Sequence, residues 1–198
     1  RSFGGQFRGS LEGDFRTNLP AYRLAGNLKQ IDLAQLLLAG TDVGEFFSGT
    51  LGCDVLLQAA GWGPLELRRS LQGTVIGVVT DATLRHINLL AVMRAAVGML
   101  PEETDAQPGT ALQSLAGEFR LANRRVRFEG ARMVVDTAAL EMGGEVDFDG
   151  RLNLRVRGEP LLVADIEPSL ARRQLFTSSF EIRGQLRKPV VRAAAASR

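Results

Sequence analysis

The segment Leu115-Ala116-Gly117-Glu118-Phe119-Arg120-Leu121 places an apolar or small side chain at every odd-numbered position. Successive side chains of a β-strand point to opposite faces of its sheet, so this alternation predicts a strand with one apolar and one polar face. A similar pattern runs through residues 112–158. The sequence therefore predicts a sheet with a broad apolar face, and the main question is what covers that face.

The composition is that of a folded protein large enough for one domain. Hydrophobic residues make up 45% of the 198 residues and charged residues 23%, which excludes wholesale disorder. The net charge is only +2, and no basic stripe is interleaved with aromatic residues, so we expect no nucleic-acid partner. No apolar run reaches the ~18 residues of a membrane-spanning helix. Because the chain begins with Arg1 rather than Met, we expect a fragment or processed product whose signal or anchor would lie upstream.

A long strand is also predicted near the N-terminus, over about 13 residues from Phe3 to Phe15. Its apolar face carries the aromatic and leucine side chains together with three glycines, Gly5, Gly9 and Gly13. Glycine weakens the interior of a strand, so its presence on this face needs a reason. Two explanations stay open. Either the sheet coils strongly or packs closely against another backbone there, or the face leaves room for an elongated ligand.

Two related segments predict short helices that each follow a strand. The sequence Leu28-Lys29-Gln30-Ile31-Asp32-Leu33 matches Leu84-Arg85-His86-Ile87-Asn88-Leu89 in residue type, 56 positions later. Asp and Asn are favoured helix caps, so one helix is expected after Asp32, ending near Gly40, and another from Asn88 to about Leu100. A second signature, Ser-Leu-x-Gly, occurs at 70–73 and at 114–117. These weak repeats indicate one domain, 1–198, with two repeat-like modules, 1–67 and 68–192.

The segment around Asp149-Gly150 predicts a hairpin and its register. A three-residue loop, 148–150, with Gly150 in the left-handed conformation, places charged residues opposite charged or polar residues on one face and apolar residues opposite apolar residues or glycine on the other. The predicted pairs are Asp147 with Arg151, Glu145 with Asn153, Glu141 with Arg157, Val146 with Leu152, Gly144 with Leu154 and Met142 with Val156.

The sequence gives no sign of catalytic or metal chemistry. A single histidine, His86, and a single cysteine, Cys53, rule out sites that need two imidazoles or a thiolate cluster. Cys53 has apolar neighbours, which favours a small buried residue over a reactive thiol. The carboxylates of the 141–147 segment face arginines or amides in the predicted hairpin, which is typical of a solvated surface. We therefore expect no catalytic residues, no metal and no cofactor.

The predicted fold is mainly β: a long curved antiparallel sheet of about ten or eleven strands with two to four short helices. Two short helices cannot cover so long an apolar face. Either the sheet closes into a sandwich or barrel, or it forms a groove that accepts an apolar ligand. For the groove, the sequence nominates ten inward side chains as ligand contacts: Phe3, Phe7, Leu11, Phe15, Val75, Phe119, Leu121, Met142, Val146 and Leu154.

Several of these segments resemble the C-terminal region of AsmA-like proteins. The resemblance is carried by Ser114-Leu115-Ala116-Gly117-Glu118-Phe119-Arg120-Leu121, by Gly143-Gly144-Glu145-Val146-Asp147-Phe148, and by Gly184-Gln185-Leu186-Arg187-Lys188-Pro189-Val190. It is strongest over 68–192 and looser over 1–67. Where such proteins usually have an Asn-Gly turn, this chain has Asn123-Arg124.

The resemblance implies a Gram-negative envelope protein related to TamB, YhdP and eukaryotic bridge-like lipid transfer proteins. It implies a periplasmic β-rich body with an elongated apolar groove, tethered to the inner membrane by an N-terminal helix that is missing from this sequence. The implied role is non-enzymatic: phospholipid or another acyl-chain ligand would be bound, for lipid transport or homeostasis between the two membranes. The alternative is a closed scaffolding domain that assists outer-membrane assembly through other envelope proteins.

Overall fold

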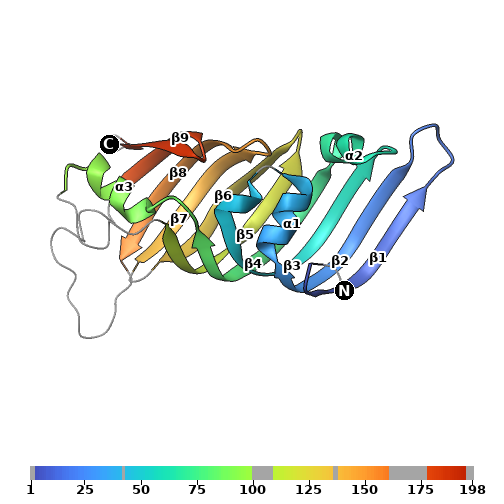
Figure 1. Ribbon diagram of the computed structural model, residues 1–198, viewed down its shortest axis with the longest axis horizontal. Coiled ribbons are helices and arrows are strands. Elements are labelled where there is room, and N and C mark those ends of the chain that lie inside the picture. Colours follow the sequence, from blue (N-terminus) through green and yellow to red (C-terminus); the bar gives the residue numbers. More distant parts are fainter. Residues whose placement is uncertain (1–2, 42, 100–108, 136–137, 161–177, 195–198) are drawn as a thin grey trace.

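The protein forms one antiparallel sheet of ten strands, in which each strand pairs with its neighbours in sequence (Figure 1). The computed structural model describes residues 3–41, 43–99, 109–135, 138–160 and 178–194. Within these ranges the sheet is open and does not close into a barrel, and three short helices accompany it. This confirms the predicted fold class, with ten strands and an open rather than a closed sheet. The sequence also predicts a helical turn or two within 165–173 and a loop over 101–109, and of these only Gly109 lies among the described residues.

The first half of the chain contains the three helices and a 3-10 turn. The elements are β1 (Gln6–Asp14), β2 (Ala21–Asp32), α1 (Leu33–Gly40), η1 (Gly44–Phe46), β3 (Phe47–Ala60), α2 (Pro64–Ser70), β4 (Gln72–Leu84) and α3 (Leu89–Ala96). The second half consists of hairpins, formed by β5 (Thr110–Ala122), β6 (Arg125–Val135), β7 (Ala138–Asp147), β8 (Arg151–Pro160), β9 (Ser179–Gln185) and β10 (Lys188–Ala193).

Two predicted boundaries were wrong for the same backbone reason. The first strand begins at Gln6 rather than Phe3, because Phe3 and Gly4 both have positive φ and form a turn. The second helix ends at Ala96 rather than near Leu100, because Gly98 takes a φ of +72° and its N–H donates to the carbonyl of Ala95. At both places a left-handed residue ends the regular element.

The predicted helix caps are confirmed, and the two similar segments share a backbone feature. The Asp32 side chain accepts a hydrogen bond from Gln35 N–H (3.1 Å), and Asn88 Oδ1 accepts one from Ala91 N–H (3.0 Å). The repeat extends to the backbone, since the equivalent residues Gln30 and His86 both have positive φ, 55° and 64°. In the first copy this residue lies at an irregularity inside β2, and in the second it lies just after the end of β4.

The hairpin between β7 and β8 has the predicted register. Val146 lies opposite Leu152, and Glu141 lies opposite Arg157. Gly150 has a φ of +85°, and Arg151 N–H donates to Asp147 Oδ1 at 2.8 Å. Pairing of charge with charge and of apolar with apolar side chains was therefore enough to fix the alignment of these two strands.

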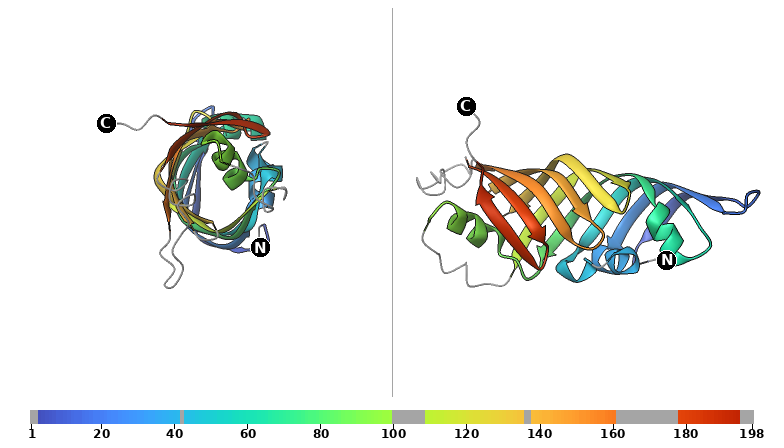
Figure 2. Two further views of the ribbon diagram at one scale, coloured as in Figure 1. Left: turned by 90° about the vertical axis from the view of Figure 1, so that its left-hand side faces the viewer. Right: turned by 90° about the horizontal axis from the view of Figure 1, so that it is seen from above.

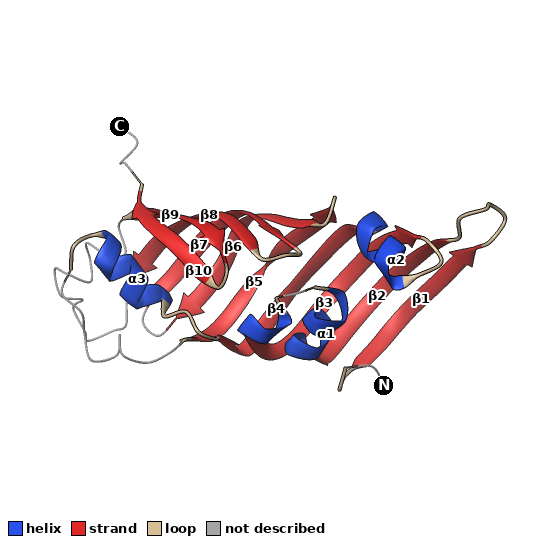
Figure 3. Ribbon diagram, turned by 45° about the horizontal axis from the view of Figure 1, so that its top comes forward, coloured by secondary structure: helices blue, strands red, loops and turns tan. Residues whose placement is uncertain are grey.

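The sheet curls into a trough whose long axis runs across the strands. Seen along this axis, α3 lies inside the outline of the strands (Figure 2). The strand connections form two rims. The upper rim carries the β1–β2 turn, α2 and the turns of the later hairpins, and the lower rim carries α1, η1 and α3 (Figures 1 and 3).

Candidate functional site

Two rows of apolar side chains and glycines cross the entire sheet on one face. In the first row each residue is the cross-strand partner of the next: Leu11, Leu24, Leu57, Gly73, Leu121, Val126, Val146, Leu152, Gly184 and Pro189. The second row has the same property: Gly9, Gly26, Val55, Val75, Phe119, Phe128, Gly144, Leu154, Ile182 and Val191. We call the face that carries both rows the inner face.

The inner face is the concave one. Leu89 and Met93 of α3, and Leu33 and Leu36 of α1, pack into the same hydrophobic cluster as the inner-face side chains. Because α3 lies inside the curl of the sheet (Figure 2), the face it contacts is the inside of the trough. The opposite, convex face carries ion pairs, such as Glu145 between Arg125 (3.0 Å) and Arg127 (2.9 Å).

Exposure of the inner face differs between the two ends of the trough. Leu11 on β1 is 68% exposed, whereas Phe180 on β9 is fully buried. Between them, the side chains of the first row from Leu24 to Val146 are half-buried. An apolar track thus runs from an open end at β1 to a filled end at β8 and β9. Six strand spacings separate β1 from β7, which is about 29 Å at roughly 4.8 Å each.

At the filled end, the two rims meet across the trough. Arg187, in the turn between β9 and β10, forms an ion pair with Glu45 of η1 (2.5 Å) and lies 5.8 Å from the ring centre of Phe46. Residues of α3 also contact β10. At β1, by contrast, the inner-face residue Leu11 is left exposed.

The glycines of β1 and β2 make room for aromatic rings of the protein itself. Gly9 and Gly26 are cross-strand partners, and Phe7 extends over both of them. A Cβ built on Gly9 would lie 2.9 Å from the Phe7 ring and 2.2 Å from the carbonyl oxygen of Ala25. Gly13 is covered in the same way by the Phe15 ring. Close packing therefore explains these glycines, and the rings that fill the space form the floor of the open end.

The structure places eight of the ten nominated residues within strands on the inner face: Phe7, Leu11, Val75, Phe119, Leu121, Met142, Val146 and Leu154. Phe3 lies in the turn before β1, and Phe15 lies just beyond its end. Met142 is buried in the filled part, so a ligand at the open end would not reach it. Whether any of the ten contacts a ligand stays a prediction.

Sequence reasoning missed two residues of the half-buried apolar track, Leu24 and Leu57. Leu24 alternates with Tyr22, Gly26 and Leu28, so its signal was present but weak. Leu57 was obscured by Leu56, an exposed apolar residue on the convex face that interrupts the alternation of β3.

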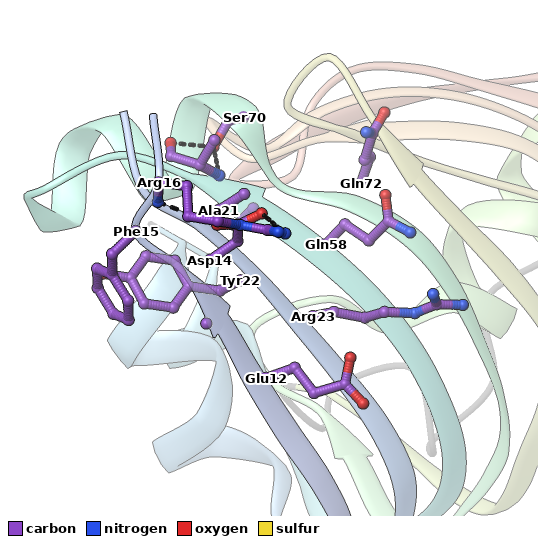
Figure 4. A pocket seen from close by; sticks show the side chains of 13 residues that line it. Glu12, Asp14, Phe15, Arg16, Ala21, Tyr22, Arg23, Gln58, Ser70 and Gln72 are labelled. Carbon is purple, nitrogen blue, oxygen red and sulfur yellow. Dashed lines mark hydrogen bonds and ion pairs between the residues drawn. The ribbon is translucent and has the colours of Figure 1, made fainter. Parts of the chain in front are cut away.

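A hollow of about 870 Å³ lies over the upper ends of β1–β4 (Figure 4). Phe15 and Tyr22 turn to one side of the strands, and Glu12, Arg23 and Gln58 turn to the other. The hollow therefore spans the end of the sheet, and Phe15, Tyr22 and Ala59 line it on the side of the apolar track. Within it Asp14 pairs with Arg16 at 2.7 Å, which lowers the pKa of the carboxyl below its usual value.

The remaining chemical groups offer no reactive arrangement. Cys53 is buried on β3, and burial, with a smaller effect of the Asp54 charge, raises the pKa of its thiol to about 11. His86 packs edge-on against Phe46, with 6.1 Å between ring centres. Across the described residues, no group of three His, Cys, Asp or Glu side chains could hold a metal ion.

Comparison with known proteins gave no match to any family model, curated protein or solved structure. Among the described helices, none combines the length and apolar character needed to cross a membrane.

Proposed function

We propose that this protein is a non-enzymatic lipid-binding module whose inner face holds acyl chains. The observation that carries the proposal is the exposed part of that face. Leu11 is 68% exposed, yet it belongs to a row of apolar residues and glycines that continues across all ten strands into a buried core. Apolar surface continuous with a core is costly to leave in water, and each methylene buried there gains about 0.8 kcal/mol.

The dimensions of the half-buried track suit an acyl chain. The hydrocarbon core of a bilayer is about 30 Å thick, so one leaflet contributes about 15 Å. A track of about 29 Å accommodates one extended acyl chain with length to spare. The resemblance to AsmA-like proteins supports the same ligand class. On that basis we also propose a periplasmic location and a role in moving or balancing phospholipid between the two membranes.

The test is native mass spectrometry of the purified protein, followed by lipid extraction. We expect a stoichiometric phospholipid adduct in the wild type. Leu11→Glu should lose the adduct, because it places a charge on the inner face at a position exposed enough to leave the fold intact. Ser10→Glu is the matched control, since it adds the same charge to the convex face of the same strand and should keep the adduct.

Circular dichroism should show the same β-rich spectrum for all three proteins. A wild type that stays free of lipid after incubation with phospholipid vesicles would overturn the proposal. So would an adduct of equal abundance in Leu11→Glu. Either result would favour the second candidate, a scaffolding domain. One observation supports that candidate: β1 pairs only with β2 among the described strands, which leaves an edge that a partner's strand could occupy.

A further inference from the structure

Three exposed apolar side chains gather on the upper rim beside the open end of the trough. Leu19 lies in the turn between β1 and β2, and Trp62 and Leu65 lie in the connection that contains α2. Their exposed fractions are 49%, 68% and 70%. We call these three residues the rim patch. Phe15, also exposed, lies in the same turn and lines the hollow shown in Figure 4.

The rim patch is held in place by hydrogen bonds between its two segments. Trp62 Nε1–H donates to the carbonyl of Asn18 (3.1 Å), and Gly61 N–H donates to the carbonyl of Pro20 (2.9 Å). The backbone N–H of Trp62 donates to Glu66 Oε2 at 2.6 Å. The indole ring is therefore exposed although its polar atom is already satisfied within the protein.

The charges around the rim patch suit the surface of a bilayer. The carboxylates of Asp14 and Glu66 are engaged, the first by Arg16 and the second by the amide of Trp62. Arg69 of α2 is also exposed, and Arg16 is exposed although it is paired with Asp14. Tryptophan and leucine flanked by arginine form the side-chain set that enters the boundary between lipid headgroups and acyl chains.

The position and size of the rim patch favour a lipid surface over a protein partner. The β1–β2 turn and the connection with α2, which carry its residues, both lie on the upper rim (Figure 1). Three side chains cannot bury the roughly 800 Å² per partner of a standard protein interface. The patch also adjoins the open end, because Leu19 lies in the turn that joins β1 to β2.

We propose that the rim patch inserts into the interface of a phospholipid bilayer and sets the open end of the inner face against it. This inference rests on the proposed function, since a lipid-binding trough needs a route by which acyl chains enter. The bilayer is recognised by Trp62 and Leu65 at the tip, with Leu19 beside them and arginines at the headgroup level.

Trp62 is the only tryptophan in the chain, so its fluorescence reports directly on the patch. Adding vesicles of phosphatidylethanolamine and phosphatidylglycerol to the wild type should shift the emission to shorter wavelength, and the protein should float with the vesicles. The double variant Trp62→Ser/Leu65→Ser should lower the floated fraction by about tenfold or more. The control is Ile76→Ser/Val78→Ser, which removes two exposed apolar side chains from the convex face and should float like the wild type.

Different measurements test the two proposals: the lipid adduct tests the inner face as a lipid site, and flotation tests the rim patch as a membrane contact. Leu11→Glu should lose its lipid adduct but still float, whereas Trp62→Ser/Leu65→Ser should keep the adduct carried through purification but not float. If the double variant does not give the wild-type circular dichroism spectrum, Leu65→Ser alone takes its place. The inference is overturned if the wild type neither shifts nor floats, or if both double variants lose flotation equally.

Discussion

Cys53 shows how strongly the inner face differs from the solvent. It is 4% exposed, and its thiol pKa is raised to about 11 from an ordinary value of 9.0. Because the folded state holds the proton more tightly than the unfolded state, this thiol favours folding fully below pH 9. That contribution is lost as the pH rises from 9 to about 11.

We therefore expect Cys53 to react slowly with a disulfide reagent at pH 8, where only about one thiol in a thousand is ionised in the folded state. Reaction should become fast in denaturant. The variant Ser10→Cys, which places a thiol on the exposed convex face of β1, should react quickly in the native protein and serves as the control. Equal rates at the two positions would contradict the assignment of Cys53 to a dry face.

At the scale of single residues, the sequence predicted correctly those roles that depend only on residues nearby in the chain. Asp32 and Asn88 were identifiable as caps because a cap needs only the next few residues. The left-handed conformation of Gln30 and His86 was not identifiable, because Gln does not favour positive φ and a single His is too weak a signal on its own. The exposure of Trp62 depends on contacts with Asn18, 44 residues away, so no local pattern indicates it.

At the scale of elements, the pairing of β1 with β2 depends on two facing glycines. Gly9→Ala should lower the free energy of unfolding by about 1–3 kcal/mol, because its Cβ would lie 2.2 Å from a backbone oxygen. Gly52→Ala is the control. A Cβ there meets nothing within 4 Å, so the change should be neutral or stabilising by up to about 1 kcal/mol. Urea denaturation measures both, and equal effects would show that β1 tolerates a side chain at this site.

The elements that the sequence predicted best are those with two independent signals. The β7–β8 hairpin combined a turn residue, Gly150, with matching charges, and its register was correct. By contrast, β3 and α2 were not delimited. Leu56 disrupts the alternation of β3, and the seven residues of α2 are too few to show a helical period.

At the scale of the whole molecule, stability should differ between the two ends of the trough. Hydrogen exchange should be slowest in β7–β9, where inner-face residues such as Val156 and Phe180 are almost fully buried, and fastest in β1. If the inner face binds lipid, adding phospholipid should slow exchange in β1 and β2 with little change in β8. Uniform protection along the trough, or slower exchange in β1 than in β8, would contradict this picture.

The meeting of the two rims was beyond sequence reasoning. Arg187 and Glu45 are 142 residues apart, and each is an ordinary charged residue in its own segment. Alternation identifies which side chains face inward, but it does not determine how tightly the sheet curls. The open end and the filled end arise from that curl. The sequence alone therefore does not decide whether the apolar face is exposed or covered.

The simple order of the sheet also bears on how the protein folds. Every described strand pairs only with the strands before and after it, so no strand has to wait for a partner made much later. Short-range pairing lowers the entropy lost in closing loops and speeds folding of a β protein. A chain that emerges gradually from a ribosome or a translocation channel can therefore add one hairpin at a time, in the order of its synthesis.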